Sequence, residues 1–224
     1  MPSTEQARRV NDDVVPVAVS EAQPVKAEET GAEPEAAFTD DVKSEPALPP
    51  LSAHEYRQYN KLAARMDMFH EHFRQTWTML YQAASSGRRP AGMSLRQYID
   101  QGLQFLSQLT LHHGIEEQHV FPVLARRMPE FQSGGKGKGK GEGKRRAAEL
   151  LRQHGEIHKG MDAMEDYLRR CRCGEADFES AVMKAQMDTW GAVLWKHLDQ
   201  EVETLRPENM RRYWSLEELK HIPM

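Results

Sequence analysis

Between residues 52 and 90, apolar side chains recur at three- and four-residue spacings, which is the pattern of a helix with one buried face. Ser52 and Glu55 have the spacing of a capping box, so we expect the helix to begin there. Gly87 and Pro90 end the pattern. The apolar stripe of this first predicted helix consists of Leu62, Met66, Phe69, Phe73, Trp77 and Leu80.

The same periodicity predicts three further helices. The second runs from the capping signal at Ser94 to about residue 128, and Pro122 is expected to kink it. The third runs over about 145–172 and ends before Gly174, and the fourth runs over about 177–205 and ends before Pro207. No segment has a strand pattern of note. Four long amphipathic helices predict an all-α, antiparallel up-down-up-down four-helix bundle.

The segments outside the helices differ in composition. Residues 1–50 carry 11 acidic and 4 basic side chains, 7 of the 12 prolines and one aromatic residue, Phe38, so we expect a disordered acidic tail. Residues 133–144 alternate glycine with charge and predict a flexible loop. The predicted bundle domain therefore covers 51–207, and 208–224 form a C-terminal extension with a short helix and Trp214 packed on the bundle.

Charge and hydropathy exclude several functional classes. No stretch approaches the roughly 18 consecutive apolar residues of a membrane helix, and the acidic N-terminus does not have the pattern of a secretory signal, so we expect a location in the cytoplasm or the nucleus. The Lys and Arg residues of 133–144 lack interleaved aromatics, so nucleic acid is not the expected partner. Cys171 and Cys173 are too few for a thiolate zinc site and are expected to be reduced thiols.

Histidine interrupts the apolar stripes of the first and third helices. A rotation of about 100° per residue places His70 near Trp77 on the apolar side, whereas His72 falls on the opposite side. In the third helix, His154 and His158 lie one turn apart on the apolar face. These positions predict that His70, His154 and His158 face the interior of the bundle.

The second and fourth helices each offer a histidine and a glutamate one turn apart. In the fourth helix the pair is His197 and Glu201. The apolar arc of the second helix is broad enough to include two such pairs, which are His112 with Glu116 and His113 with Glu117.

An internal repeat favours one of these pairs. Histidine, glutamate and proline stand at offsets 0, 4 and 10 from His197. Offsets counted from His112 give the same three residue types, whereas offsets counted from His113 do not. We therefore predict His112 and Glu116 as the inward pair, and leave open whether His113 or Glu117 also contributes.

Seven inward polar side chains need a shared partner. A single histidine on an apolar face is more often a hydrogen-bonded core residue than a ligand. Burying each of seven without a partner would cost about 1–3 kcal/mol, and the sum exceeds the stability of a typical domain. Two divalent cations would satisfy neutral imidazoles and carboxylates together. The predicted metal ligands are His70, His112, Glu116, His154, His158, His197 and Glu201.

Four segments of the chain resemble the hemerythrin-like, or HHE cation-binding, family over about residues 52–207. They are MFHEHFRQTW, LHHGIEEQHVFPVL, LRQHGEIHKGM and WKHLDQEVETLRP. Two positions depart from the family pattern: Val202 follows Glu201 in place of a second acid, and Arg206 precedes Pro207 where phenylalanine is common. The sequence ENMRRYWSLEELKHIPM is similar to the C-terminal tails of fungal members. The resemblance implies the bundle fold and the seven metal ligands given above.

The resemblance also implies a function. It implies two iron ions bridged by carboxylates and an oxo or hydroxo group, with zinc or manganese as alternative metals. The nitrogen-rich ligand set and an open coordination position favour binding of a small diatomic ligand, dioxygen or nitric oxide, or the handling or sensing of iron. An alternative is an enzyme that reduces peroxide or dioxygen or repairs iron centres. A second alternative is an interaction module with a structural metal. No catalytic residue is assigned.

Overall fold

The computed structural model describes residues 48–132 and 142–223. Residues 1–47 of the predicted tail and residues 133–141 of the predicted loop lie outside this part, so the structure tests neither prediction. The unit Leu48–Met224 contains every element described below.

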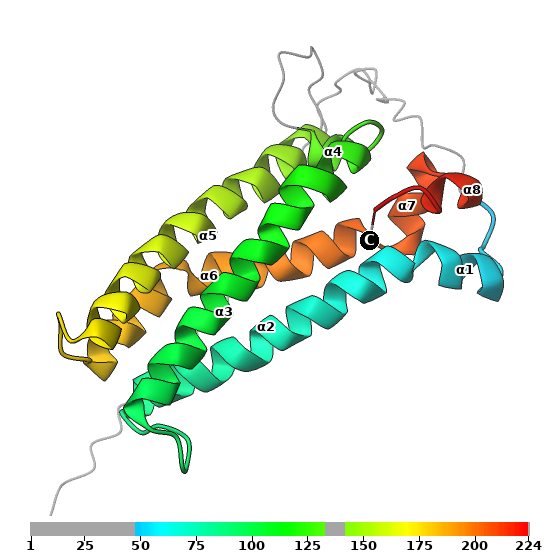
Figure 1. Cartoon of the computed structure of the whole chain (residues 1–224). Coiled ribbons are helices and arrows are strands. Elements are labelled where there is room, and N and C mark those ends of the chain that lie inside the picture. Colours follow the sequence, from blue (N-terminus) through cyan, green and yellow to red (C-terminus); the bar gives the residue numbers. More distant parts are fainter. Residues whose placement is uncertain (1–47, 133–141, 224) are drawn as a thin grey trace, which may run out of the picture. The chain divides into compact units, whose positions relative to one another are not determined.

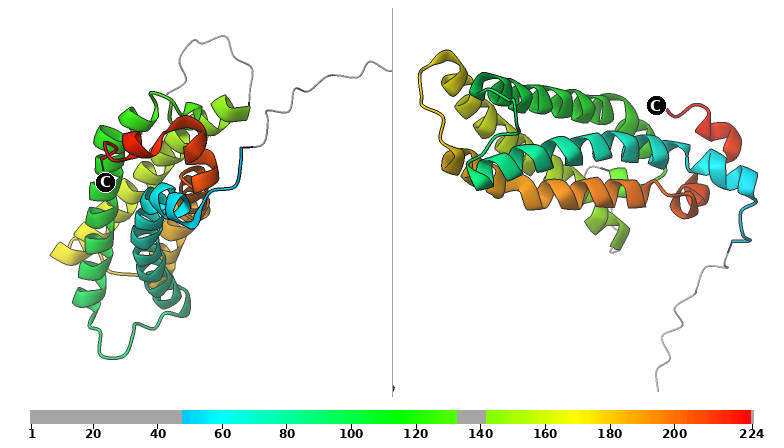
Figure 2. Two further views of the ribbon diagram at one scale, coloured as in Figure 1. Left: turned by 90° about the vertical axis from the view of Figure 1, so that its right-hand side faces the viewer. Right: turned by 90° about the horizontal axis from the view of Figure 1, so that it is seen from below.

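Four long helices form the body of this unit (Figure 1). They are α2 (Lys61–Ser86), α3 (Leu95–Ile115), α5 (Glu142–Cys173) and α6 (Ser180–Thr204). Consecutive helices run in opposite directions; α2 packs against α3 and α6, and α5 packs against the same two helices. Figure 2 shows the four helices side by side from two directions. The predicted all-α up-down-up-down bundle is confirmed, and the described residues contain no strand.

The first predicted helix is two helices in the structure. Ser52 and Glu55 form the expected capping box at the start of α1 (Ala53–Tyr59), and α2 begins two residues after α1 ends. Asn60 lies between them with φ −80° and ψ −7°, close to helical values. Asparagine is a weaker helix former than alanine or leucine, which favours a break at this position. Because the Asn60 dihedral angles stay close to helical values, the break is limited to one residue.

The second predicted helix changes its winding before Pro122. After α3, the chain forms a π-helical turn, η1 (Glu116–Val120), and then α4 (Phe121–Leu124). The Phe121 N–H donates to the Glu116 carbonyl, five residues earlier, in place of the usual four. Pro122 has no N–H to donate. The expected kink at Pro122 is therefore an irregular turn that begins at Glu116.

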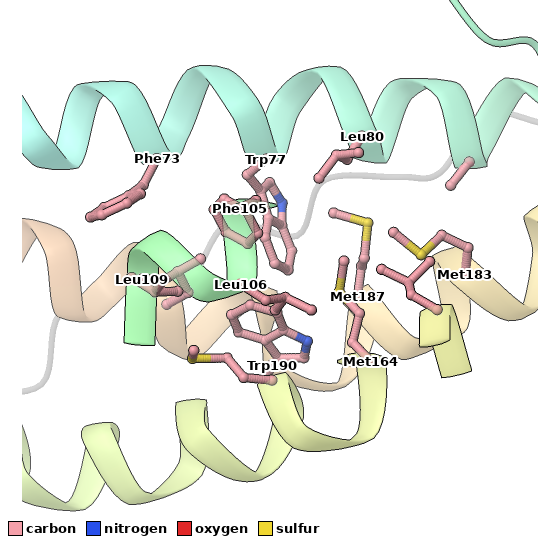
Figure 3. Close-up of a cluster of buried hydrophobic side chains, with 14 of the residues drawn as sticks. Phe73, Trp77, Leu80, Phe105, Leu106, Leu109, Met164, Met183, Met187 and Trp190 are labelled. Carbon is pink, nitrogen blue, oxygen red and sulfur yellow. The ribbon is translucent and has the colours of Figure 1, made fainter. Parts of the chain in front are cut away.

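The interior contains two apolar clusters with a polar layer between them. Figure 3 shows the first cluster, in which the Trp77 and Trp190 rings meet edge to face with centroids 4.6 Å apart. The second cluster includes Met66, Val120 and Leu205. Along each long helix, the histidines and glutamates of interest fall between residues of the first cluster and residues of the second. The polar side chains therefore share one level of the bundle.

The C-terminal extension covers the end of the bundle that holds the second cluster. Helices α7 (Pro207–Tyr213) and α8 (Leu216–Leu219) follow α6, and a 3-10 turn, η2 (Pro129–Phe131), follows α4. Trp214 is buried; its carbonyl accepts a bond from the Tyr59 hydroxyl at 2.9 Å, and the Arg127 guanidinium lies over its ring. The predicted packing of Trp214 on the bundle is confirmed. Of the helices in the described residues, none is long and apolar enough to span a membrane.

Candidate metal centre

α2 places His70 inside the bundle and His72 outside it, as the helical phase predicts. His70 is fully buried, whereas His72 is exposed. The His70 Nδ1 atom lies 3.0 Å from the Leu198 carbonyl oxygen of α6. Because a carbonyl only accepts, Nδ1 carries the proton and the Nε2 lone pair is free. That Nε2 atom lies 3.2 Å from Nε2 of His112 and 3.3 Å from Glu201 Oε2.

The end of α3 and the first residue of η1 turn two histidines and one glutamate toward the interior. His112 Nε2 lies 2.7 Å from Glu116 Oε1, and Glu116 is 1% exposed. His113 is fully buried beside His112, and its ring stacks on the His154 ring with centroids 4.2 Å apart. Because successive helix residues differ by about 100°, both histidines border the broad inward arc.

α5 and α6 complete the layer. The Nε2 atoms of His154 and His197 lie 3.1 Å apart, close to the about 3.0 Å expected for two nitrogens about 2.1 Å from one ion at a right angle. His197 Nε2 is 3.6 Å from Glu201 Oε2, and His154 Nε2 is 3.6 Å from Glu116 Oε2. The layer is therefore continuous across all four long helices.

These side chains form two groups whose potential ligand atoms lie within 4.8 Å of one another. The first group is His113, Glu116, His154 and His197. The second is His70, His112, Glu116 and Glu201. Glu116 belongs to both groups, so its two carboxylate oxygens can face two cations at once.

His158 belongs to neither buried group, although its ring meets the His113 ring edge to face with centroids 5.3 Å apart. Its Nε2 atom is 3.4 Å from Glu117 Oε1, and the same carboxylate oxygen lies 2.7 Å from His154 Nδ1. Glu117, His154 and His158 make a third, partly exposed group. The structure thus brings six of the seven predicted ligands into the two buried groups, adds His113, and places His158 at their edge. The ligand role of each residue stays a prediction.

The buried groups fit metal cations because several of their polar atoms have no other partner. Within the described residues, both ring nitrogens of His113, Nδ1 of His197 and both oxygens of Glu201 are buried and accept or donate no hydrogen bond. Such orphaned atoms normally cost about 1–3 kcal/mol each. Imidazole and carboxylate atoms are ordinary ligands of iron, zinc and manganese, so a cation removes this cost.

Burial sets the protonation of the imidazoles. It lowers the pKa of His197 to about 3 and that of His112 to about 4; the Glu201 carboxylate opposes these shifts, and neighbouring histidines add to them. Burial also lowers the pKa of His113 and His154. The four imidazoles are therefore neutral at pH 7, the form that binds metal.

The two buried carboxylates differ. Burial, with the Glu201 charge, raises the pKa of Glu116 well above its usual value. Burial alone would raise the pKa of Glu201 too, but the contact with His70 and the nearby imidazoles lower it to about 2. The two carboxylates therefore differ in proton affinity: Glu116 holds a proton more tightly than a free glutamate does, and Glu201 holds one less tightly.

A helical bundle with a buried layer of imidazoles and carboxylates is the architecture of a cation-binding protein. The family model described as hemerythrin HHE cation binding domain matches residues 61–208, and the chain belongs to this family. The resemblance of the four sequence segments is thereby confirmed.

The chain is also similar to the dimeric xanthone biosynthesis cluster protein R11 of Cryptosporiopsis sp. (strain 8999), with 25% identity over 119 residues. The match covers 50% of this chain and 38% of that protein, well under half of the relative's length. No solved structure matches the chain.

Proposed function

We propose that the chain binds two iron ions, one in each buried group, and that the centre binds a small diatomic ligand, dioxygen or nitric oxide. The observation that carries the proposal is that both four-residue groups share Glu116. A carboxylate between two cations offsets their repulsion, which would otherwise be large in a low-dielectric interior. The shared residue therefore favours a pair of ions over a single one.

The composition of the layer supports iron held by nitrogen. His70, His112, His113, His154 and His197 supply imidazoles to the two groups, against two carboxylates. Iron bound there would supply an open coordination position for the diatomic ligand. The protein's own contribution is to hold the imidazoles neutral, to fix the His70 ring through the Leu198 carbonyl and to surround the layer with two apolar clusters that exclude water.

Substitution of the glutamates tests the proposal. We expect about two metal ions per chain in the unaltered protein, measured by elemental analysis of protein from its own host. Glu116→Ala and Glu201→Ala should each lower this to one or none, because the remaining imidazoles cannot balance two cations. Glu117→Ala should retain both ions, since Glu117 belongs to neither buried group. Two ions in all three variants would contradict the shared carboxylate.

Optical spectra test the ligand. Anaerobic ferrous protein exposed to dioxygen or nitric oxide should develop a stable absorption band that disappears when the gas is removed. The same treatment of Glu116→Ala should give no such band.

A second candidate is an enzyme that reduces dioxygen or peroxide at the same centre. It is favoured by the name of the relative from Cryptosporiopsis, which places that protein in a biosynthesis cluster. Steady consumption of dioxygen or peroxide would support this candidate over reversible binding.

A further inference from the structure

An apolar groove lies beside the candidate metal centre, on the outer side of α2 and α3. Its cavity volume is about 370 Å³. Phe69 and Phe73 line it from α2, and Leu111 and Ile115 line it from α3. Three of these large side chains remain open to solvent: Phe69 is 41% exposed, Leu111 65% and Ile115 45%. We call this feature the α2/α3 groove.

The α2/α3 groove reaches the polar layer at one point. His112 and Glu116 contribute to its lining, and both belong to the second buried group. The His112 side chain is 11% exposed, whereas the His70 and Glu201 side chains of that group are fully buried. The His112 ring also contacts Phe73 and Phe69, with centroids 5.1 and 5.7 Å apart. A molecule in the groove would therefore lie against His112.

The size of the groove points to an organic molecule. A diatomic ligand needs little more room than one water, about 30 Å³ of liquid, so the groove is about ten times larger than such a ligand requires. Cavities of about 300–1,000 Å³ are typical of sites for drug-sized compounds. A mostly apolar lining with two phenylalanine rings favours an aromatic compound, because rings pack well edge to face and in offset stacks.

The charge at the groove indicates a second feature of the ligand. Arg65 contributes to the lining, is exposed, and has no ion pair or side-chain hydrogen bond within the described residues. His72 and Gln108, which also line the groove, are joined by a 3.2 Å contact between Nε2 and Oε1. Arg65 is thus the cation available to a guest, and a guanidinium binds anionic oxygens strongly.

We propose that the α2/α3 groove binds an aromatic compound of about two or three rings that carries an anionic oxygen, with its rings between Phe69 and Leu111 and its oxygen at Arg65. The proposal goes beyond the proposed function, because it depends on neither the identity nor the number of cations. It assigns to the protein an organic ligand beside the centre, in addition to a diatomic one.

Calorimetric titration of the metal-loaded protein with 2-naphthoate and with the neutral 2-naphthalenemethanol tests the proposal. We expect 2-naphthoate to bind with one molecule per chain. Phe69→Ala should weaken binding of both compounds by about tenfold, the scale of one lost aromatic contact. Arg65→Gln should weaken 2-naphthoate only. Leu111→Trp should fill the groove and abolish binding of both compounds.

Met68→Ala is the matched control, because Met68 is 61% exposed on the same helix and does not line the groove. It should bind both compounds as the unaltered protein does. Metal content and helicity, measured for every variant, should stay constant, which separates failure of the groove from failure of the metal centre. The proposal is overturned if 2-naphthoate does not bind or if Leu111→Trp still binds it. It is also overturned if the unaltered protein is a dimer and Leu111→Trp is a monomer, because a second copy of the chain would then occupy the groove.

Discussion

At the scale of single residues, α2 offers two histidines two positions apart with opposite surroundings. His70→Ala should lower metal content, because it removes a fully buried imidazole of the second group. His72→Ala should leave metal content unchanged, since the His72 side chain is exposed, contacts Gln108 and belongs to neither buried group. Elemental analysis after removal of loosely bound metal measures both. Loss of metal in the His72 variant alone would show that the centre lies elsewhere.

The structure places His113 in the first group, whereas the sequence predicts His158 as a metal ligand. His113→Ala should weaken metal binding by at least about tenfold, because even outer-shell partners of a metal ligand contribute that much. His158→Ala should have a smaller effect, since the His158 ring contacts Glu117 at the edge of the layer. Competition with a chromogenic chelator measures the affinities. A larger loss in the His158 variant would restore the ligand set expected from the family resemblance.

Much of the candidate site follows from the sequence at this scale. His70 and His154 are buried where the helical phase places them, and His197 and Glu201, predicted from their one-turn spacing, are buried too. The sequence does not specify whether His113 is buried, because one broad apolar arc of the helix includes both His112 and His113. The HHGIEE segment contains a second histidine–glutamate pair, His113 with Glu117, and the sequence leaves a contribution from His113 open. Only the packing of α5 against α3 shows that the His154 ring covers it.

At the scale of elements, two glycines of α5 have opposite roles. A Cβ on Gly160 would lie 2.2 Å from Trp190 Cγ, whereas a Cβ on Gly155 would meet nothing within 4 Å. Gly160→Ala should destabilise the protein by about 1–3 kcal/mol, because a buried tryptophan side chain must shift. Gly155→Ala should stabilise it by about 0.5–1 kcal/mol through helix propensity. Urea unfolding of the two variants measures both effects, and equal values would contradict the close contact.

The extent of the helices was predictable, but their irregularities were not. Capping signals at Ser52 and Ser94 begin α1 and α3 as expected. The π-helical turn at Glu116 depends on which carbonyl the Phe121 N–H reaches, and neither periodicity nor Pro122 specifies that choice. Such turns are frequent at functional sites, and here the turn begins at the residue shared by both groups.

At the scale of the whole molecule, the buried histidines make stability depend on pH. The pKa of His197 is lowered to about 3 and that of His112 to about 4, below the 6.5 of an exposed histidine. The unfolded chain therefore binds more protons than the folded one between these values, and stability rises with pH across this window. Glu116 opposes the trend above pH 4.5, because its pKa is raised on folding. Four imidazoles with lowered pKa outweigh one such carboxylate.

The urea midpoint of metal-free protein should therefore fall as the pH is lowered from about 6.5 toward about 4. His197→Asn should reduce the slope, because it removes one of the groups that take up a proton on unfolding. His72→Asn is the matched control and should keep the slope of the unaltered protein. A midpoint independent of pH across this window would show that the imidazoles are not shielded from water.

The groove and the polar layer occupy adjacent positions on the same two helices. Phe69 precedes His70, Leu111 precedes His112, and Ile115 precedes Glu116; in each pair the first residue lines the groove and the second belongs to a buried group. Substitutions can therefore reshape the groove among descendants while the ligands stay in place. A one-residue insertion or deletion would rotate both sets by about 100° and exchange their surroundings. We therefore expect homologous proteins to differ in the compounds that their grooves bind through substitutions, and to keep the lengths of α2 and α3 constant.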